Sequence, residues 1–249
     1  MKTTSRAVVT AGGVVLWLLV LVPPIAQWAH RYEIAQVVQF CVAAYVVPAL
    51  IVVGAPWAMI GLASPMGQTP ARWFDRLARA RRTEHHQQRA AYVAMVFVVL
   101  TVVARVVPVV NFIAPRWWAS VVQSLVLTSV GIALFLELIE SAPLSPRASR
   151  PYRIGVSAVV MWSAWIVAYL EGMSGNTWYG YFIHVTGRSL SLAVDQQLVA
   201  GATWFLTALV FLPIVFSNLM QWLSTGNDEK EELSKLIREE RNRGFFGSD

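Results

Sequence analysis

The chain has 249 residues, of which 56% are hydrophobic and 14% are charged, and its formal net charge is +6. An ordinary soluble domain carries about a quarter charged residues, so this composition excludes a water-soluble globule and a disordered chain. The single cysteine, Cys41, excludes an internal disulfide framework and a CxxC metal or redox motif. The composition therefore predicts an all-α polytopic membrane protein.

Long apolar runs separated by short charged stretches predict six transmembrane helices, because a helix needs about 20 apolar residues to cross a bilayer. The predicted spans are residues 7–28, 34–54, 91–113, 117–139, 154–171 and 198–223. Residues 1–226 are thus expected to form one transmembrane domain, followed by a charged cytoplasmic tail at 227–249. The first run contains no small-residue cleavage site, which favours a retained helix over a signal peptide.

Three further segments have helical or interfacial character without being long and apolar enough to cross. Residues 72–90 place Trp and Phe on one face and arginines on the other, which predicts a short amphipathic helix on the cytoplasmic surface. Residues 178–194 are apolar but interrupted by glycines and an arginine, and they are interpreted as an interfacial or re-entrant loop. Residues 228–243 predict a polar C-terminal helix, more typical of a solvated tail than of a partner-binding stripe.

The basic residues sort to one side of the predicted membrane. Sixteen lysines and arginines lie in the segments on the N-terminal side, against three on the other side: Arg31, Arg116 and Arg188. This bias predicts that both termini are cytoplasmic. Membrane insertion explains the basic charge, so no nucleic-acid partner is expected.

Histidines and aromatic residues collect at the predicted outer ends of the helices. The aromatic residues are interpreted as an interfacial anchoring belt. His30 and His184 are the only histidines on that side, and with Cys41 they are the candidate metal ligands. Two histidines from distant loops, without a third ligand at a set spacing, are a weak metal signal.

Arg105 lies inside the third predicted span, where a guanidinium costs several kcal/mol unless it finds a partner or snorkels. Asp195 and Glu171 both lie near the same outer end. We expect a buried structural pair of Arg105 with Asp195, with snorkelling to the outer headgroups as the alternative.

Several glycines are expected to mark close approaches between helices, because small residues let backbones pack closely in lipid. These are Gly12, Gly13, Gly54, Gly131, Gly155 and Gly201. A leucine at position 201 is accordingly expected to damage folding.

Signatures of catalysis and transport are missing from the sequence. It contains no GxGxxG, P-loop, HExxH or GxSxG motif, so no catalytic residue is predicted and the chain is not expected to be an enzyme. A chain of intramembrane carboxylates, as in an ion-coupled pump, is absent as well. A small-molecule transporter would need a polar central cavity, for which the sequence offers only Arg105 and scattered polar residues.

Two motifs in the second and sixth spans carry a family resemblance. PALIVVGAPW (Pro48–Trp57) and AVDQQLVAGATW (Ala193–Trp204) resemble the CtaG family of cytochrome c oxidase assembly factors. The matching positions are Pro48, Gly54, Ala55, Pro56, Asp195, Gln196, Gln197, Gly201 and Trp204. Asp195 is also well placed to cap the helix that opens near Gln196.

The resemblance implies a multi-pass protein of the bacterial plasma membrane that contacts other membrane subunits, including an aa-type oxidase, and supplies copper to it. Family members usually have seven spans and carry two histidine pairs at i,i+4 spacing. The corresponding positions here are Gln36, Phe40, Ser120 and Ser124, and none of these replaces imidazole as a copper ligand.

We therefore expect a CtaG-like assembly factor with copper delivery weakened or lost. No resident cofactor is expected, and copper is suggested by the family resemblance alone. The alternative is a permanent accessory subunit of a respiratory or photosynthetic membrane complex.

Overall fold

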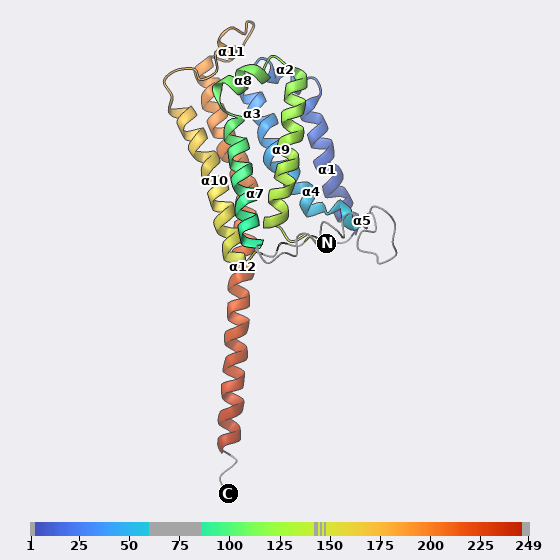
Figure 1. The fold of residues 1–249 in the computed structure, drawn as a ribbon, viewed down its shortest axis with the longest axis vertical. Helices are drawn as coiled ribbons and strands as arrows, with labels where there is room; N and C mark the ends of the chain where they lie inside the picture. Colours follow the sequence, from blue (N-terminus) through green and yellow to red (C-terminus); the bar gives the residue numbers. More distant parts are fainter. Residues whose placement is uncertain (1–2, 60–85, 142–143, 145, 147, 246–249) are drawn as a thin grey trace.

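The computed structural model describes residues 3–59, 86–141, 144, 146 and 148–245, and every regular element within them is helical. The helices form an elongated bundle from which the C-terminal helix projects (Figure 1). Five helices are long and apolar enough to cross a membrane, or six if one bent pair counts as a single span. The predicted all-α polytopic class is confirmed, whereas the amphipathic helix predicted at 72–90 lies outside the described residues up to position 85.

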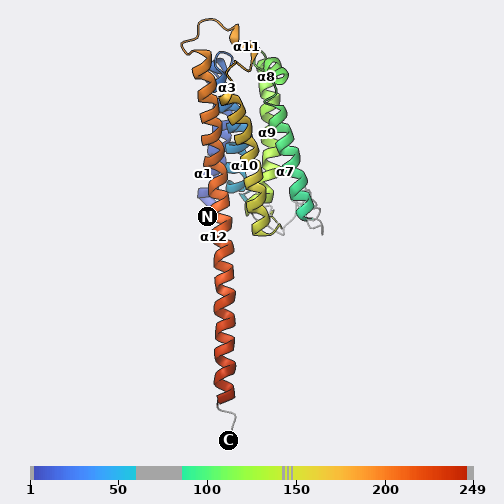
Figure 2. The same ribbon diagram turned by 90° about the vertical axis from the view of Figure 1, so that its left-hand side faces the viewer.

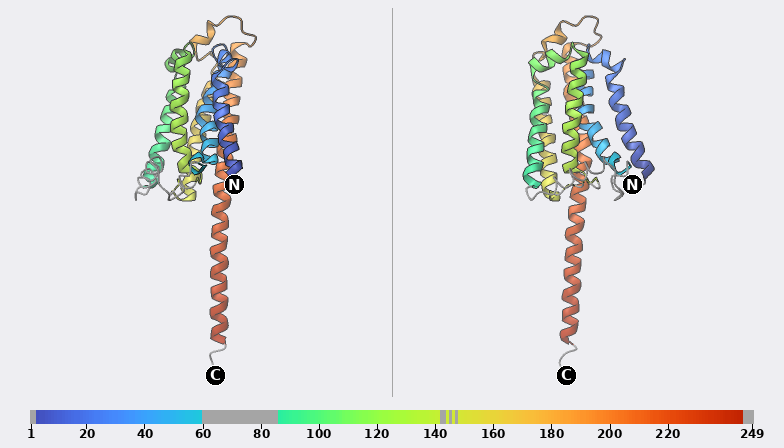
Figure 3. Two further views of the ribbon diagram at one scale, coloured as in Figure 1. Left: turned by 90° about the vertical axis from the view of Figure 1, so that its right-hand side faces the viewer. Right: turned by 45° about the vertical axis from the view of Figure 1, so that its right-hand side comes forward.

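The first two spans occupy the N-terminal part of the described chain. Their elements are α1 (Thr3–Leu21), α2 (Ile25–Ala29), α3 (Glu33–Cys41), the π-helix η1 (Val42–Val46), α4 (Val47–Gly54) and α5 (Pro56–Met59). The later elements are α7 (His86–Val103), α8 (Val107–Ile113), α9 (Trp117–Leu138), α10 (Arg150–Met173), α11 (Gly180–Ile183) and α12 (Leu192–Phe245). Helix α1 lies at one side of the bundle (Figure 3).

The two ends of the bundle differ. Helix α1 begins, and α12 leaves the bundle, at the same end, while α2, α8 and α11 lie across the opposite end (Figure 1). We call this opposite end, where residues 178–194 lie over the helix ends, the outer end. Six crossings, with the bent pair counted as one span, would agree with this placement of the two ends of the chain.

The third span is not the continuous helix predicted at 91–113. Helix α7 ends at Val103, and α8 turns away from it by 70°. Val106 is extended, and Pro108 lies in the first turn of α8. In a continuous helix Pro108 would have no amide hydrogen to donate to the carbonyl oxygen of Ala104, whereas the first turn of a helix tolerates proline, so the helix stops and restarts here.

The last span and the tail form one helix rather than the two predicted at 198–223 and 228–243. Helix α12 runs without a break from Leu192 to Phe245 and extends well past the other helices (Figure 2). The connecting residues contain one glycine, Gly226, and no proline. A single glycine inside a helix costs only about 1 kcal/mol, which does not terminate it.

Aromatic side chains from four segments meet in the centre of the bundle. The rings of Phe135 and Phe211 stack with centroids 5.5 Å apart, and Tyr45 lies edge-on to Phe211 at 5.9 Å and to Phe97 at 5.8 Å. All four side chains are buried. This cluster joins η1, α7, α9 and α12, because large aromatic surfaces gain most from close packing.

Pro48 explains the contact between the second span and α9. Its nitrogen cannot donate to the carbonyl oxygen of Ala43, five residues earlier in the π-helical register, and the Thr128 hydroxyl donates to that oxygen at 2.9 Å instead. A methyl group at Gly131 would lie 2.6 Å from Pro48 Cγ and 2.7 Å from the Ala44 carbonyl oxygen. The two helices therefore approach as closely as glycine allows.

The prediction of close approach holds for some glycines and is wrong for others. Methyl groups built at Gly54 and Gly131 would collide with a neighbouring helix, and one at Gly13 would make a tight contact, 3.1 Å from Leu50 Cβ. Those at Gly12, Gly155 and Gly201 would meet nothing within 4 Å. Gly172, which was not predicted, also lies at a close approach, because a methyl group there would lie 2.8 Å from Ala200 Cβ. Composition identifies small residues, but only the rotation of each helix decides which of them face a neighbour.

We predict that Gly131→Ala lowers the stability of the detergent-solubilised protein by about 1–3 kcal/mol, because a rigid proline ring and a backbone oxygen cannot make room for the methyl group. Gly12→Ala is the matched control, and its better helix propensity leaves stability unchanged or raised by up to about 1 kcal/mol. Thermal unfolding of both variants measures the difference. Equal stability of the two variants would contradict the assigned contact.

Candidate functional site

A buried ion-pair cluster lies at the outer end of the bundle, at the break between α7 and α8. Arg105 lies in this break and is 6% exposed. Its Nη2 is 2.5 Å from Glu171 Oε1 of α10 and 3.9 Å from Glu33 Oε1 of α3. The predicted pair of Arg105 with Asp195 is therefore wrong, and so is snorkelling, because the guanidinium points into the protein.

Aromatic groups enclose the guanidinium. Its carbon lies 5.2 Å from the ring centroid of Tyr179 and 5.8 Å from that of Phe40, distances typical of cation–π contacts. The Tyr179 hydroxyl also donates to the carbonyl oxygen of Arg105 at 3.0 Å, which satisfies a backbone group freed by the helix break. Tyr179 and Phe182 pack against α8, so residues 178–194 cover the outer end rather than re-enter the bundle.

Asp195 forms a second buried centre beside the first. Its two carboxylate oxygens accept hydrogen bonds from the backbone amides of Glu33 at 2.8 Å and Ile34 at 3.0 Å. It therefore caps α3, which begins at Glu33, and not the helix that opens near Gln196, as the sequence suggested. Arg188 forms an ion pair with the same carboxylate. The sequence offered a signal for this pair, since Arg188 precedes Asp195 by only seven residues.

The motif around Asp195 divides between the inside and the outside of the bundle. Gln196 is buried and donates through Nε2 to the carbonyl oxygen of Glu171 at 2.6 Å, which ties α12 to the end of α10. Gln197 and Gly201 are exposed, and Trp204 is 45% exposed. Spacings of four and three residues place these three on one face of α12.

The motif around Gly54 terminates a helix. Ala55 follows α4 with a φ of 48° and a ψ of 62°, a left-handed conformation typical of helix C-caps, and Pro56 begins α5. The Ser141 hydroxyl donates to the carbonyl oxygen of Val52 at 2.7 Å. This motif shapes the inner end of the second span and contributes no side chain to the outer cluster.

A second polar site lies between α3 and α9. Gln36, Phe40, Ser120 and Ser124 line a single cavity of about 10 Å³, together with Gln39 and Gln123. The structure thus brings together both pairs of positions at which the family resemblance implies histidines. Gln36 Oε1 is buried and has no hydrogen-bond partner among the described residues, whereas Ser124 accepts a hydrogen bond from Trp17 Nε1 at 2.8 Å. A cavity of this size and polarity has room for about one water molecule.

The three candidate metal ligands occupy different environments. Cys41 is fully buried in the central core, and His184 is exposed at the end of α11. His30 Nδ1 hydrogen-bonds the carbonyl oxygen of Ala114. Among residues 3–59, 86–141 and 148–245, the structure contains no group of three or more His, Cys, Asp or Glu placed to hold a metal ion.

The bundle, its central aromatic core and its ion-paired outer end define a polytopic helical membrane protein. The family model described as cytochrome c oxidase caa3 assembly factor (Caa3_CtaG) matches residues 2–225. The chain therefore belongs to the CtaG family of cytochrome c oxidase assembly factors. No curated protein and no solved structure matches the chain.

We predict opposite effects for two conservative changes in the outer cluster. Glu33 and Glu171 contribute two carboxylates around Arg105, and Glu33 Oε1 is 3.9 Å from the guanidinium. Glu33→Gln replaces a buried carboxyl group whose Oε1 makes no hydrogen bond to the described residues, and it leaves the shorter ion pair in place, so stability is retained or raised. Glu171→Gln removes the partner at 2.5 Å and is expected to lower stability by about 3–5 kcal/mol.

Thermal unfolding of the two purified variants, compared with the wild type, measures this asymmetry. The two substitutions change the same number of atoms, so each is the control for the other. Equal losses of stability in both variants would show that Glu33 and Glu171 share the guanidinium equally.

Proposed function

We propose that this protein assists the assembly of a haem–copper oxidase in the bacterial plasma membrane through protein contact, without catalysing a reaction and without handing over copper itself. Membership of the assembly-factor family supports the general role. The donor atoms in the cavity between α3 and α9 support the more specific proposal that the protein does not hand over copper.

Copper would be the cargo of a delivery factor, and the cavity does not suit it. Cu(I) prefers thiolate, thioether and imidazole ligands. At the first pair of positions where the resemblance implies histidines, this chain has the Gln36 amide and the Phe40 ring. At the second pair it has the hydroxyls of Ser120 and Ser124. These oxygen donors are hard ligands, and Ser124 already accepts a hydrogen bond from Trp17. The four positions therefore line one cavity, but their side chains are not the ligands that Cu(I) prefers.

The exposed face of α12 favours action by contact. Gln197 and Gly201 belong to the family-like motif, yet they are exposed. Trp204, which follows on the same face, is 45% exposed and stacks on Trp165 of α10 with ring centroids 4.7 Å apart. A methyl group at Gly201 would meet nothing within 4 Å, so packing inside this chain does not require a glycine there. A glycine on an exposed face of a membrane helix permits the close approach of a helix from another protein.

Gly201→Leu is expected to leave the protein folded and abundant in the membrane while reducing the amount of mature oxidase. This reverses the effect on folding expected from the sequence, because the structure leaves space around Gly201. Oxidase content is measured from the haem spectrum and the oxygen uptake of membranes, and protein abundance by immunoblot. Gly12→Leu, at another open glycine, is the control. A normal content of mature oxidase in the Gly201→Leu strain would contradict a role of this face of α12 in partner contact.

Reintroducing histidines tests the copper argument directly. The wild-type protein, purified and incubated with Cu(I), is expected to hold no copper above background. Gln36→His, Ser120→His and Ser124→His combined are expected to hold about one copper per chain, because their side chains line one cavity. Phe40 is left unchanged because its ring packs on Arg105. Copper bound by the wild type, and lost on joint replacement of His30, Cys41 and His184, would contradict the proposal.

A gene deletion separates the assembly role from that of a permanent subunit. Loss of mature oxidase in the deletion strain, with none of this protein in the purified oxidase, is the expected result. Stoichiometric presence in the purified complex would support the accessory-subunit alternative instead.

A further inference from the structure

The buried ion-pair cluster at the outer end contains more acidic than basic side chains. Its carboxyl groups belong to Glu33, Glu171 and Asp195, and its guanidinium groups belong to Arg105 and Arg188. Each of these five side chains is 7% exposed or less. If every group were ionised, the cluster would hold one uncompensated negative charge, which is costly in a buried site.

One half of the cluster is already balanced. Arg188 forms an ion pair with Asp195, whose two carboxylate oxygens also accept hydrogen bonds from backbone amides at the start of α3. The excess charge therefore falls on the other half, where the carboxyl groups of Glu33 and Glu171 both face the guanidinium of Arg105.

The carboxyl groups of this second half lack a hydrogen atom to share. Glu33 Oε1 and Glu171 Oε2 are buried, and neither has a hydrogen-bond partner among the described residues. The two side chains lie within hydrogen-bonding reach of each other, yet ionised carboxylates are acceptors only. The Tyr179 hydroxyl cannot supply the hydrogen, because it donates to the carbonyl oxygen of Arg105. A proton on one carboxyl group would donate to the other and would also restore the charge balance.

We propose that Glu33 and Glu171 form a proton-binding site, in which one proton is held between their carboxyl groups at neutral pH while Glu171 keeps its ion pair with Arg105. When two carboxyl groups share a buried site, the one with the weaker contact to a positive charge keeps the proton. That group is Glu33, because its Oε1 is 3.9 Å from Arg105 Nη2, against 2.5 Å for Glu171 Oε1. The site is independent of the assembly role and does not rest on it.

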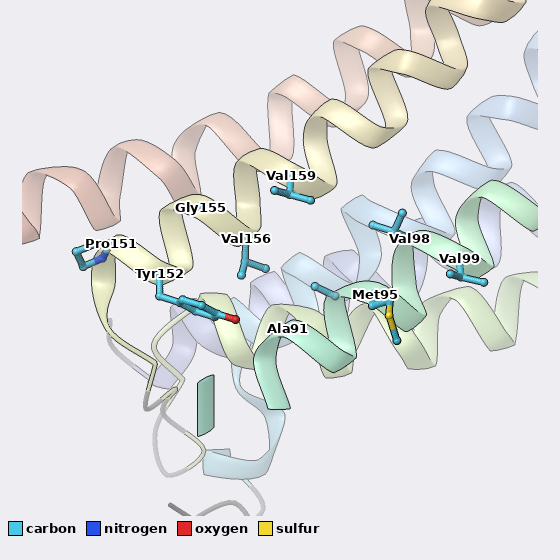
Figure 4. A pocket seen from close by; sticks show the side chains of 10 residues that line it. Ala91, Met95, Val98, Val99, Pro151, Tyr152, Gly155, Val156 and Val159 are labelled. Atoms are coloured by element: carbon cyan, nitrogen blue, oxygen red, sulfur yellow. The ribbon is translucent and has the colours of Figure 1, made fainter. Parts of the chain in front are cut away.

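The opposite end of the bundle shows the reverse balance of charge. An apolar groove of about 620 Å³ lies there between α7 and α10, and none of its lining residues is acidic (Figure 4). At the same end, Glu140 Oε1 lies 3.3 Å from Arg153 Nη1 and 3.9 Å from Arg150 Nη2, and the Glu140 side chain is 51% exposed. A solvated carboxylate beside two guanidinium groups stays ionised, so Glu140 provides a matched control.

Infrared spectroscopy of the full-length protein, purified in detergent, tests the proposal through the C=O stretching band of a protonated carboxyl group. At neutral pH the wild type is expected to show this band, and glutamate labelled with carbon-13 at its side-chain carboxyl is expected to move it to lower frequency. Glu33→Gln is expected to abolish the band, because it leaves Glu171 alone beside Arg105. Glu140→Gln is expected to retain it.

A second measurement uses the labelled wild type and does not depend on the folding of a variant. In heavy water the band is expected to shift only slowly, because the side chains of Glu33 and Glu171 are 2% and 1% exposed. A wild type without a label-sensitive band, or with one that exchanges within the time of mixing, would overturn the proposal. Persistence of the band in folded Glu33→Gln, or its loss in Glu140→Gln, would overturn it as well.

Discussion

The burial of one guanidinium in an apolar protein sets the arrangement of the outer end. A charged group removed from water costs several kcal/mol unless an opposite charge accompanies it. Arg105 meets this requirement in the break that follows Val103, where its side chain lies beside Glu171 of α10 and Glu33 of α3. The break in the helix and the buried charge therefore coincide, and Tyr179 contacts both through its ring and its hydroxyl.

The neighbouring carboxylate of Asp195 satisfies buried backbone amides as well as a buried charge. It satisfies the first amides of α3, a helix 162 residues earlier in the chain, and pairs with Arg188. Together the two centres fix the beginnings of α3 and α12 and the end of α10. Hydrophobic burial cannot hold helices together in lipid as it does in water, so such polar contacts specify which helix ends meet. At the opposite end α7 and α10 separate and leave a groove.

The site between α3 and α9 connects the fold to the proposed function. The structure brings Gln36, Phe40, Ser120 and Ser124 to one cavity, so the arrangement expected of two histidine pairs is present without imidazole. A scaffold can keep its shape when ligand side chains are exchanged, because the helices are held by Gly131, Pro48 and the aromatic core rather than by a metal. Because the cavity is present without copper ligands, we propose that the protein assists assembly by contact.

The sequence by itself determined the class of protein, the approximate number of spans and the family, because these depend on the length and order of apolar runs and on local motifs. It also showed that Arg105 needed a partner. Only the tertiary structure decided that this partner is Glu171, that Asp195 caps α3, and that Gly155 and Gly201 face open space while Gly131 faces Pro48. These outcomes depend on how each helix is rotated and where it bends. Many alternative pairings satisfy the same one-dimensional pattern, and only three-dimensional packing selects among them.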